Sequence, residues 1–248
     1  MPWEIFRIEV PTPLLSPVGN NKTTSPTTRI SDLYTKNGGI GAYNTQFALS
    51  PDQGFGFSVL TAGRPPSSGP DLRQATMFAI NQMVTEIFTP AFENAALEQA
   101  ARNFAGTYVA SDNTTSPQSL TIVAGDGPAG LGVQNWTSED LDLVKSYFAA
   151  KNFMAVDEVP RQPTLRLYPM DLHNSEQVAF RGVYEIPNMD GVYSSGSRPF
   201  EKYCATWSQL SEPQYGNIGL DDFVFDIDET GKATAITARG ERKTLKRT

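Results

Sequence analysis

The stretch that decides the fold of the first part of this chain is Asp32–Gly63, DLYTKNGGIGAYNTQFALSPDQGFGFSVLTAG. Two runs rich in apolar residues flank the turn sequence Ser-Pro-Asp-Gln-Gly, which predicts a β-hairpin. The first run carries a lone Lys36 beside Gly38, Gly39 and Gly41. Because glycine has no Cβ, such a backbone can approach a ligand closely. The hairpin is therefore a candidate binding wall as well as a structural element.

Strand and helix patterns surround this hairpin. Residues 3–10 alternate as a strand does. After the hairpin, Asp71 is a candidate N-cap for a helix through about residue 88, in which apolar side chains recur at helical spacing. Pro90 is placed to begin a second helix that runs to about residue 104, since proline is favoured in the first helical turn. The first part of the chain is thus expected to combine antiparallel strands with two helices.

The pattern changes after residue 104 to short apolar runs separated by turns. Strands are predicted at 119–123, 131–136, 164–168, 177–184, 201–208, 222–227 and 233–238, and one helix at 138–149. Closure into a barrel or sandwich removes the unpaired edges of such a sheet. We therefore expect an α+β protein, with one domain at residues 1–104 and a mostly-β barrel or sandwich domain at residues 105–248.

Charge and hydropathy exclude several classes of partner. The chain has a net charge of -7 and a pI of about 4.8, which argues against nucleic acid and anionic membranes as main partners. The basic residues near the C-terminus are interpreted as a solvated strand or tail: Arg239, Arg242, Lys243, Lys246 and Arg247. No apolar run approaches the roughly 18 residues that a membrane span needs. We expect neither a nucleic-acid partner nor a membrane span.

Residues that often hold metals or cofactors do not form a recognisable site. The lone Cys204 lies in an apolar run and is expected to be a buried thiol, and the lone His173 lies in a polar stretch and is expected to be exposed. Residues 125–130, Gly-Asp-Gly-Pro-Ala-Gly, precede a predicted strand instead of a helix, so we expect a turn and not a dinucleotide site. Asp226–Gly231 lacks the further ligands of a calcium loop. No cofactor and no metal are expected.

Three Asn-x-Ser/Thr sequons, at Asn21, Asn113 and Asn135, are close in number to what the composition predicts by chance. The residues where a secretory signal would have its apolar core include Glu4, Arg7 and Glu9. Localisation is therefore left open by these features.

One segment carries a family resemblance. Tyr34–Tyr43, Tyr-Thr-Lys-Asn-Gly-Gly-Ile-Gly-Ala-Tyr, followed by an apolar strand and a helix, resembles the Lys-Thr/Ser-Gly region of class C serine β-lactamases and penicillin-binding proteins. The closer resemblance is to fungal β-lactamase-related proteins with an appended C-terminal β-barrel domain. Further pieces match in the same order: Pro2–Ile5, Asn103–Tyr108, Arg166–Tyr168, Cys204 with Trp207, Tyr215–Gly216 and Asp222–Phe225.

The resemblance implies a fold and a chemistry. Residues 1–104 would be the C-terminal remnant of a β-lactamase/transpeptidase-like domain, and the family would hydrolyse an amide or ester through an acyl-enzyme and be secreted. Lys36 would set the charge around the nucleophile and attract a substrate carboxylate, and the N–H of Gly39 would form part of an oxyanion hole. Gly38 would let the substrate approach. Asn37 replaces the family's hydroxyl residue but can still donate a hydrogen bond to the substrate.

The family's nucleophile motif, Ser-x-x-Lys, is not found in this sequence, and its second motif, Tyr-x-Asn, is not found N-terminal to the Lys36 segment, where the family carries both. Without a nucleophile no acyl-enzyme forms. One hypothesis is therefore that the chain is a partial family member that is inactive alone. In a related hypothesis, a separate chain supplies the missing N-terminal half. The alternative is a non-catalytic β-barrel that binds a small apolar ligand. A barrel filled with aromatic side chains would count against that alternative.

Overall fold

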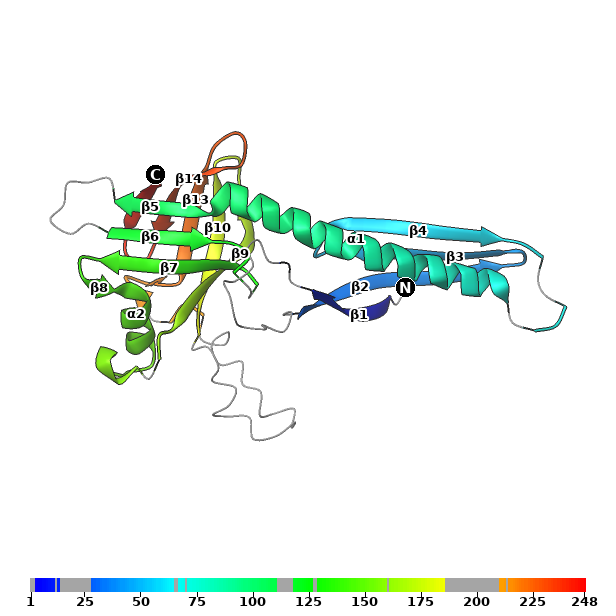
Figure 1. The fold of residues 1–248 in the computed structure, drawn as a ribbon, viewed down its shortest axis with the longest axis horizontal. Coiled ribbons are helices and arrows are strands. Elements are labelled where there is room, and N and C mark those ends of the chain that lie inside the picture. Colours follow the sequence, from blue (N-terminus) through cyan, green and yellow to red (C-terminus); the bar gives the residue numbers. More distant parts are fainter. Residues whose placement is uncertain are drawn as a thin grey trace, which may run out of the picture. The chain divides into compact units, whose positions relative to one another are not determined.

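The computed structural model describes residues 3–11, 13, 28–64, 67–69, 71–110, 118–126, 129–159, 161–185, 210–212 and 214–248. The chain divides into two compact units, Met1–Glu98 and Gln99–Thr248 (Figure 1). The strand expected at 201–208, Cys204, and the sequons at Asn21 and Asn113 lie outside the described residues. Asn135 lies in a strand of the second unit and is exposed.

The first unit contains a four-stranded antiparallel sheet in the order β1-β2-β3-β4. Its strands are β1 Glu4–Pro11, β2 Thr28–Ile40, β3 Tyr43–Ser50 and β4 Phe55–Ala62. The turn between β3 and β4 closes with a 3.2 Å hydrogen bond from the Gly54 N–H to the Pro51 carbonyl. Gly54 has φ +67°, a conformation that glycine adopts without strain. The predicted turn and the strand on each side of it are confirmed, but the first run, expected to be one strand, forms two, β2 and β3, joined by a turn at residues 41–42.

Helix α1, Leu72–Phe104, packs on one face of this sheet. Asn81 Nδ2 donates a 2.9 Å hydrogen bond to Gln46 Oε1 on β3. Phe92 stacks on Phe55 of β4 with 4.7 Å between ring centroids. The expected cap is present, because Asp71 Oδ1 accepts from the Arg73 N–H at 3.0 Å.

The prediction of two helices is wrong, because α1 continues through Pro90. Proline in a helix interior removes one backbone hydrogen bond and usually bends or ends the helix. Here the turn after Pro90 is held by tertiary contacts: Phe92 stacks on Phe55, and Glu93 accepts hydrogen bonds from the Arg29 guanidinium. The sequence pattern around Pro90 could not reveal those partners, since both lie far away along the chain.

The second unit contains a closed eight-stranded antiparallel barrel in the order β6-β5-β15-β14-β13-β10-β9-β7, which closes where β6 pairs with β7. The barrel strands are β5 Gly106–Ala110, β6 Gln118–Val123, β7 Leu131–Ser138, β9 Thr164–His173, β10 Gln177–Glu185, β13 Asp222–Ile227, β14 Ala233–Ala238 and β15 Lys243–Arg247. The remaining elements are β8 Leu141–Asp142, α2 Leu143–Lys151, the 3-10 helix Val156–Glu158, β11 Gln214–Tyr215 and β12 Ile218–Gly219.

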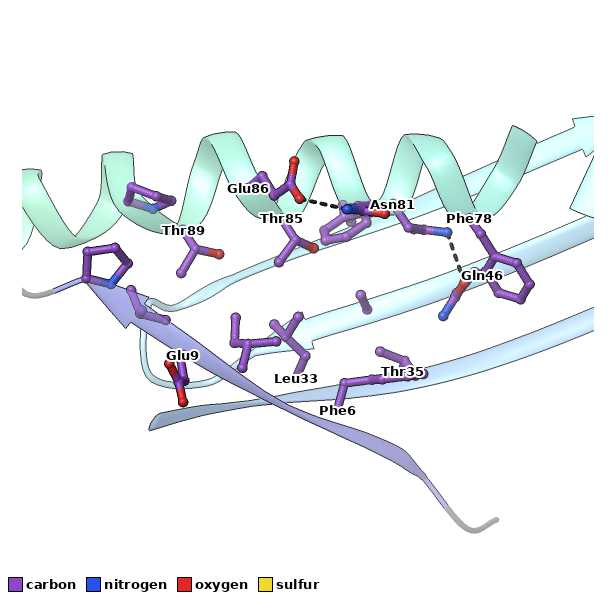
Figure 2. A pocket seen from close by; sticks show the side chains of 17 residues that line it. Phe6, Glu9, Leu33, Thr35, Gln46, Phe78, Asn81, Thr85, Glu86 and Thr89 are labelled. Atoms are coloured by element: carbon purple, nitrogen blue, oxygen red, sulfur yellow. Dashed lines mark hydrogen bonds between the residues drawn. The ribbon is translucent and has the colours of Figure 1, made fainter. Parts of the chain in front are cut away.

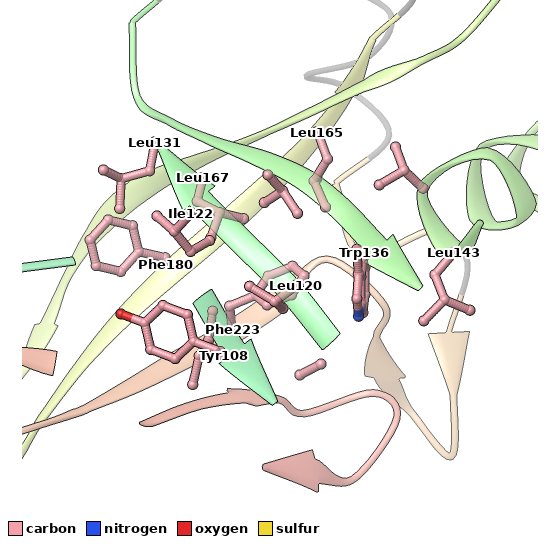
Figure 3. Close-up of a cluster of buried hydrophobic side chains, with 14 of the residues drawn as sticks. Tyr108, Leu120, Ile122, Leu131, Trp136, Leu143, Leu165, Leu167, Phe180 and Phe223 are labelled. Atoms are coloured by element: carbon pink, nitrogen blue, oxygen red, sulfur yellow. The ribbon is translucent and has the colours of Figure 1, made fainter. Parts of the chain in front are cut away.

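Aromatic and aliphatic side chains together fill the interior of the barrel (Figure 3). Phe225 contacts the rings of Tyr108 and Phe180 at centroid distances of 6.0 and 5.1 Å. Trp136 meets Phe223 edge to face at 5.4 Å. Side chains thus occupy the space in which a barrel-bound ligand would lie. This packing counts against the hypothesis of a ligand-binding barrel.

Helix α2 begins five residues later than the expected start at Ser138. Asp142 is its N-cap, because Asp142 Oδ1 accepts from the Lys145 N–H at 3.0 Å. Ser138 instead remains in β7, where it pairs with Leu141 of β8. Both residues are good caps by type, and the strand pairing decides between them.

Of the two forms expected for the C-terminal basic residues, a solvated last strand or a tail, the structure shows the strand: β15 lies between β5 and β14, and Lys246 is exposed. Leu245 of β15 is fully buried. The Arg247 guanidinium donates hydrogen bonds to the carbonyls of Asn103 and Ala105 at the end of α1. The last carbonyls of a helix lack partners within the helix, so this cation satisfies and complements them.

The expected α+β fold class, a β-lactamase-like remnant followed by a separate barrel domain, is wrong as a description of this structure. Of the described residues, 51% lie in strands and 23% in helices, so the chain is mostly β. The two expected helices of the first part merge into α1. Strand β5, which the sequence pattern did not reveal, raises the strand content and helps to complete the barrel.

Candidate functional site

The candidate site lies at the end of β2, where one edge of the strand has no strand partner. The pairing of β2 with β1 ends at Thr35, opposite Glu4, whereas its pairing with β3 continues from Lys36 to Ile40. Residues 36–40 therefore have a backbone edge that no strand of the described residues covers. Backbone N–H and C=O groups on such an edge are available to a bound molecule.

Side chains alternate between the two faces of the sheet, and this separates the predicted site residues into two pairs. Thr35 is buried on the face that α1 covers, so Lys36 and Gly38 belong to the opposite face. Asn37 and Gly39 belong to the α1 side of the strand, although both are exposed at its end. The structure thus brings the four residues to one strand end but does not direct the side chains of Lys36 and Asn37 the same way.

Lys36 forms an ion pair with Glu4 of β1. The distance from Lys36 Nζ to Glu4 Oε1 is 2.5 Å, and the two side chains are 36% and 37% exposed. Ion pairs with this much solvent contact contribute about 0–1 kcal/mol, so a substrate carboxylate can compete with Glu4 for the ammonium. The sequence analysis did not identify Glu4 as a site residue. The signal that the sequence offered was the position of Glu4, an acidic residue at the start of the strand predicted at residues 3–10.

An aromatic cluster lies beside Lys36 on the same face. The Trp3 ring is 6.3 Å from the rings of both Tyr34 and Phe47, measured between centroids. Phe47 is also the cross-strand partner of Lys36. An ammonium next to aromatic rings suits a substrate that combines a carboxylate with an apolar body. This cluster was also missed by the sequence analysis, because its three members come from three separate segments.

The Lys36 face, defined as the side of the sheet opposite α1, exposes many apolar side chains. They are Trp3, Ile5, Ile30, Ile40, Tyr43, Phe47 and Leu60. Several large apolar side chains exposed on one face of a sheet indicate a binding or association surface.

The two site glycines differ in what the chain itself requires. A Cβ on Gly39 would lie 2.7 Å from Asn44 Oδ1, so the neighbouring strand excludes a side chain there. A Cβ on Gly38 would lie 3.6 Å from Thr45 Cγ2, which is an ordinary contact. The packing of the described residues therefore accounts for a glycine at position 39 but not at position 38.

The other candidate sites weighed from the sequence have structural explanations. Residues 124–130 connect the paired strands β6 and β7, and the Asp228 carboxylate accepts backbone hydrogen bonds within the turn between β13 and β14. The turn predicted at Asp226–Gly231 is confirmed, whereas Gly127 and Pro128 of the turn predicted at 125–130 lie outside the described residues. The His173 side chain is exposed, as expected. Among the described residues, no three His, Cys, Asp or Glu side chains are grouped to hold a metal ion. None of the described helices is long and apolar enough to cross a membrane.

Comparison with known families identifies the chain. A family model described as "Beta-lactamase-like-like, C-terminal domain" matches residues 96–248. The chain belongs to this beta-lactamase-like family. This beta-lactamase-like chain is also 24% identical over 252 residues to a beta-lactamase-like protein of Arthroderma benhamiae. The family resemblance inferred from the motifs is thereby confirmed.

The alignment covers 95% of the chain but only 39% of the Arthroderma protein, so the chain spans about two fifths of the length of that relative. No solved structure matches the beta-lactamase-like chain. The family model matches the barrel unit and the end of α1. Lys36, Asn37, Gly38 and Gly39 lie outside the residues matched by that model, and their roles are argued below from the site itself.

Proposed function

We propose that this chain supplies one wall of the active site of a serine hydrolase that acts on an amide or ester. The observation that carries the proposal is the position of Lys36 next to the unpaired edge of residues 36–40 and the aromatic cluster. Residues 1–104 are, in this proposal, part of a β-lactamase-related domain, and residues 105–248 are its appended domain. The chemistry proceeds through an acyl-enzyme, as the family resemblance implies.

Each site residue has a defined role in this proposal. The Lys36 ammonium exchanges its ion pair with Glu4 for the substrate carboxylate and donates to the nucleophile's proton network. The Gly39 N–H contributes to an oxyanion hole. Gly38 admits the substrate, in line with the lack of a packing reason for glycine there. Asn37 binds substrate from the same strand end through its exposed backbone and amide groups.

The nucleophile comes from outside this sequence, because Ser-x-x-Lys is not found in it and Tyr-x-Asn is not found N-terminal to Lys36. The apolar Lys36 face supports this proposal, since a further part of the domain would cover it. The greater length of the Arthroderma relative is in agreement with such a part. We propose that the chain is inactive alone and that catalysis requires this second part, on the same polypeptide or a separate one.

Turnover of nitrocefin and of a p-nitrophenyl ester tests the proposal in two steps. The chain alone should give no detectable turnover with either substrate. Co-expression with the unaligned remainder of the Arthroderma relative should produce turnover, and Lys36→Ala should then lower kcat/KM by about 10²-fold or more. The matched control is Lys232→Ala, which removes an exposed lysine from a turn of the barrel and should leave turnover unchanged.

Two outcomes would contradict the proposal. The first is turnover by the chain alone that Lys36→Ala abolishes, which would place a complete catalytic site within this sequence. The second is turnover in the co-expressed sample that Lys36→Ala and Lys232→Ala affect equally, which would remove Lys36 from the active site.

A further inference from the structure

A cavity of about 630 Å³ lies between α1 and the sheet, on the opposite side of the sheet from the Lys36 face (Figure 2). Binding sites for small molecules commonly have about 300–1,000 Å³. Its apolar walls come from β1, β2, β3, β4 and α1: Phe6, Ile8, Val10, Leu33, Ala48, Phe57 and Phe78. It shares no lining residue with the proposed active site.

The cavity exists because one helix cannot cover four strands. Adjacent strands lie about 4.8 Å apart, so four strands span about 14 Å between their outer axes, whereas a helix with its side chains is about 10–12 Å across. Contacts of α1 reach β4 through Phe92 and β3 through Asn81. On the β1 side, Phe6 remains half exposed at the cavity wall.

Two polar atoms on α1 line this cavity without a hydrogen-bond partner among the described residues: Asn81 Oδ1 and Thr89 Oγ1. Thr89 is only 2% exposed. The Asn81 amide is oriented by its Nδ2, which donates to Gln46 Oε1 at 2.9 Å and to the Met77 carbonyl at 2.8 Å. Its Oδ1 is therefore an acceptor that requires a donor. Buried polar atoms are nearly always paired, so both atoms indicate a polar ligand group.

The spacing and charge of the lining define the class of ligand. Asn81, Thr85 and Thr89 are separated by four residues each and follow one side of α1, so the polar atoms span about 12 Å along the cavity. The only charged lining residues are Glu9 and Glu86. The Glu9 side chain leaves β1 on the face opposite Phe6, Ile8 and Val10, and the exposed Glu86 carboxylate accepts a 2.8 Å hydrogen bond from Gln82 Nε2 (Figure 2). Among the described residues no Lys, Arg or His lines the cavity, so nothing there would neutralise an anionic head group such as a fatty-acid carboxylate. A neutral hydroxyl can donate to Asn81 Oδ1 and can either donate to or accept from Thr89.

We propose that the cavity beneath α1 binds an elongated, neutral, lipid-like molecule with a terminal hydroxyl group. The aliphatic part lies against the side chains of β1 and β2, and the hydroxyl pairs with Thr89 or Asn81. This inference is independent of the proposed hydrolase function, because the two sites share no lining residue. Either site can fail its test without affecting the other.

Displacement of the neutral dye Nile red from the full chain by 1-dodecanol and by dodecanoate tests the proposal at pH 8. Dodecanol should displace the dye at least about ten-fold more tightly than dodecanoate, because only dodecanoate would bring a charge into a cavity without a cationic side chain among its lining residues. Thr89→Val removes one hydroxyl at nearly constant volume and should weaken dodecanol roughly five-fold. Its matched control, Thr45→Val, makes the same change on the Lys36 face and should have no effect.

A second variant fills the cavity. Ala48 is buried in the cavity wall, so Ala48→Trp should abolish displacement of the dye by dodecanol. If Ala48→Trp fails to fold, Thr89→Val still tests the proposal. Equal displacement by dodecanol and dodecanoate, or displacement that neither variant changes, would assign the dye to another surface and overturn the proposal. Loss of dodecanol binding when the remainder of the Arthroderma relative is present would assign the cavity to a segment of protein, and would also overturn it.

Discussion

The two units bury their apolar side chains to very different degrees. In the barrel, Tyr108, Trp136, Phe223 and Phe225 are almost completely inaccessible to solvent. In the first unit, apolar side chains remain exposed on the Lys36 face, with Leu60 75% exposed, and a cavity lies between part of α1 and the other face. The barrel satisfies its own hydrophobic surface, whereas the sheet of the first unit has surface for further partners on both faces. The difference explains why we assign binding to the first unit and stability to the second.

The largest expected effect contrasts two phenylalanines. Phe225→Ala deletes a fully buried ring that contacts Phe104, Tyr108 and Phe180, and should destabilise the barrel by about 3–5 kcal/mol. Phe47→Ala removes a ring that is 40% exposed on the Lys36 face and should change stability by about 0.5 kcal/mol or less. Urea unfolding followed by circular dichroism measures both. Similar losses for the two variants would show that the first unit is as well packed as the barrel.

A second contrast concerns ion pairs. The side chain of Arg166 is 5% exposed; its guanidinium pairs with Asp126 at 2.6 Å and donates to the carbonyls of Ala129 and Gly130. Arg166→Leu leaves these acceptors without a donor and should cost about 2–4 kcal/mol. Glu4→Gln breaks the exposed pair with Lys36 and should cost under about 1 kcal/mol. Thermal unfolding of both variants measures these losses of stability. A larger loss of stability for Glu4→Gln than for Arg166→Leu would contradict the idea that Lys36 is held loosely for a substrate.

The smallest expected effect is a pH dependence within the barrel unit. Burial raises the pKa of Glu241 above its ordinary value of 4.5, while the hydrogen bond from Gln118 opposes the shift. The folded state therefore binds the Glu241 proton more tightly than the unfolded state does. This contribution to stability is present below pH 4.5 and is lost as the pH rises through the folded pKa.

Glu241→Gln isolates this contribution. The difference in unfolding free energy between the variant and the unmodified chain should grow in favour of the variant as the pH rises from 4.5 through the folded pKa, and should then level off. Urea unfolding over that pH range measures it. A difference that does not vary with pH would show that Glu241 is not buried in solution.

Local sequence predicted much of the fold and half of the candidate site. Strands β13 and β14, the hairpin between β3 and β4, and the Asp71 cap follow from alternation, turn residues and capping chemistry within a few positions. Lys36 and its glycines were found in the same way. Glu4 and the aromatic cluster were not found, because they reach Lys36 only when β1 pairs with β2 and β2 with β3.

By itself, the sequence determined the positions of most strands, the turns between them and the family, because these depend on residues close together or on ordered motifs. Only the tertiary structure decided that α1 continues through Pro90, that Arg247 binds the end of α1, and that Lys36 pairs with Glu4. Each of these joins residues that lie far apart in sequence, or depends on such a contact. Their pairing depends on how strands and helices pack, which no local pattern of residues specifies.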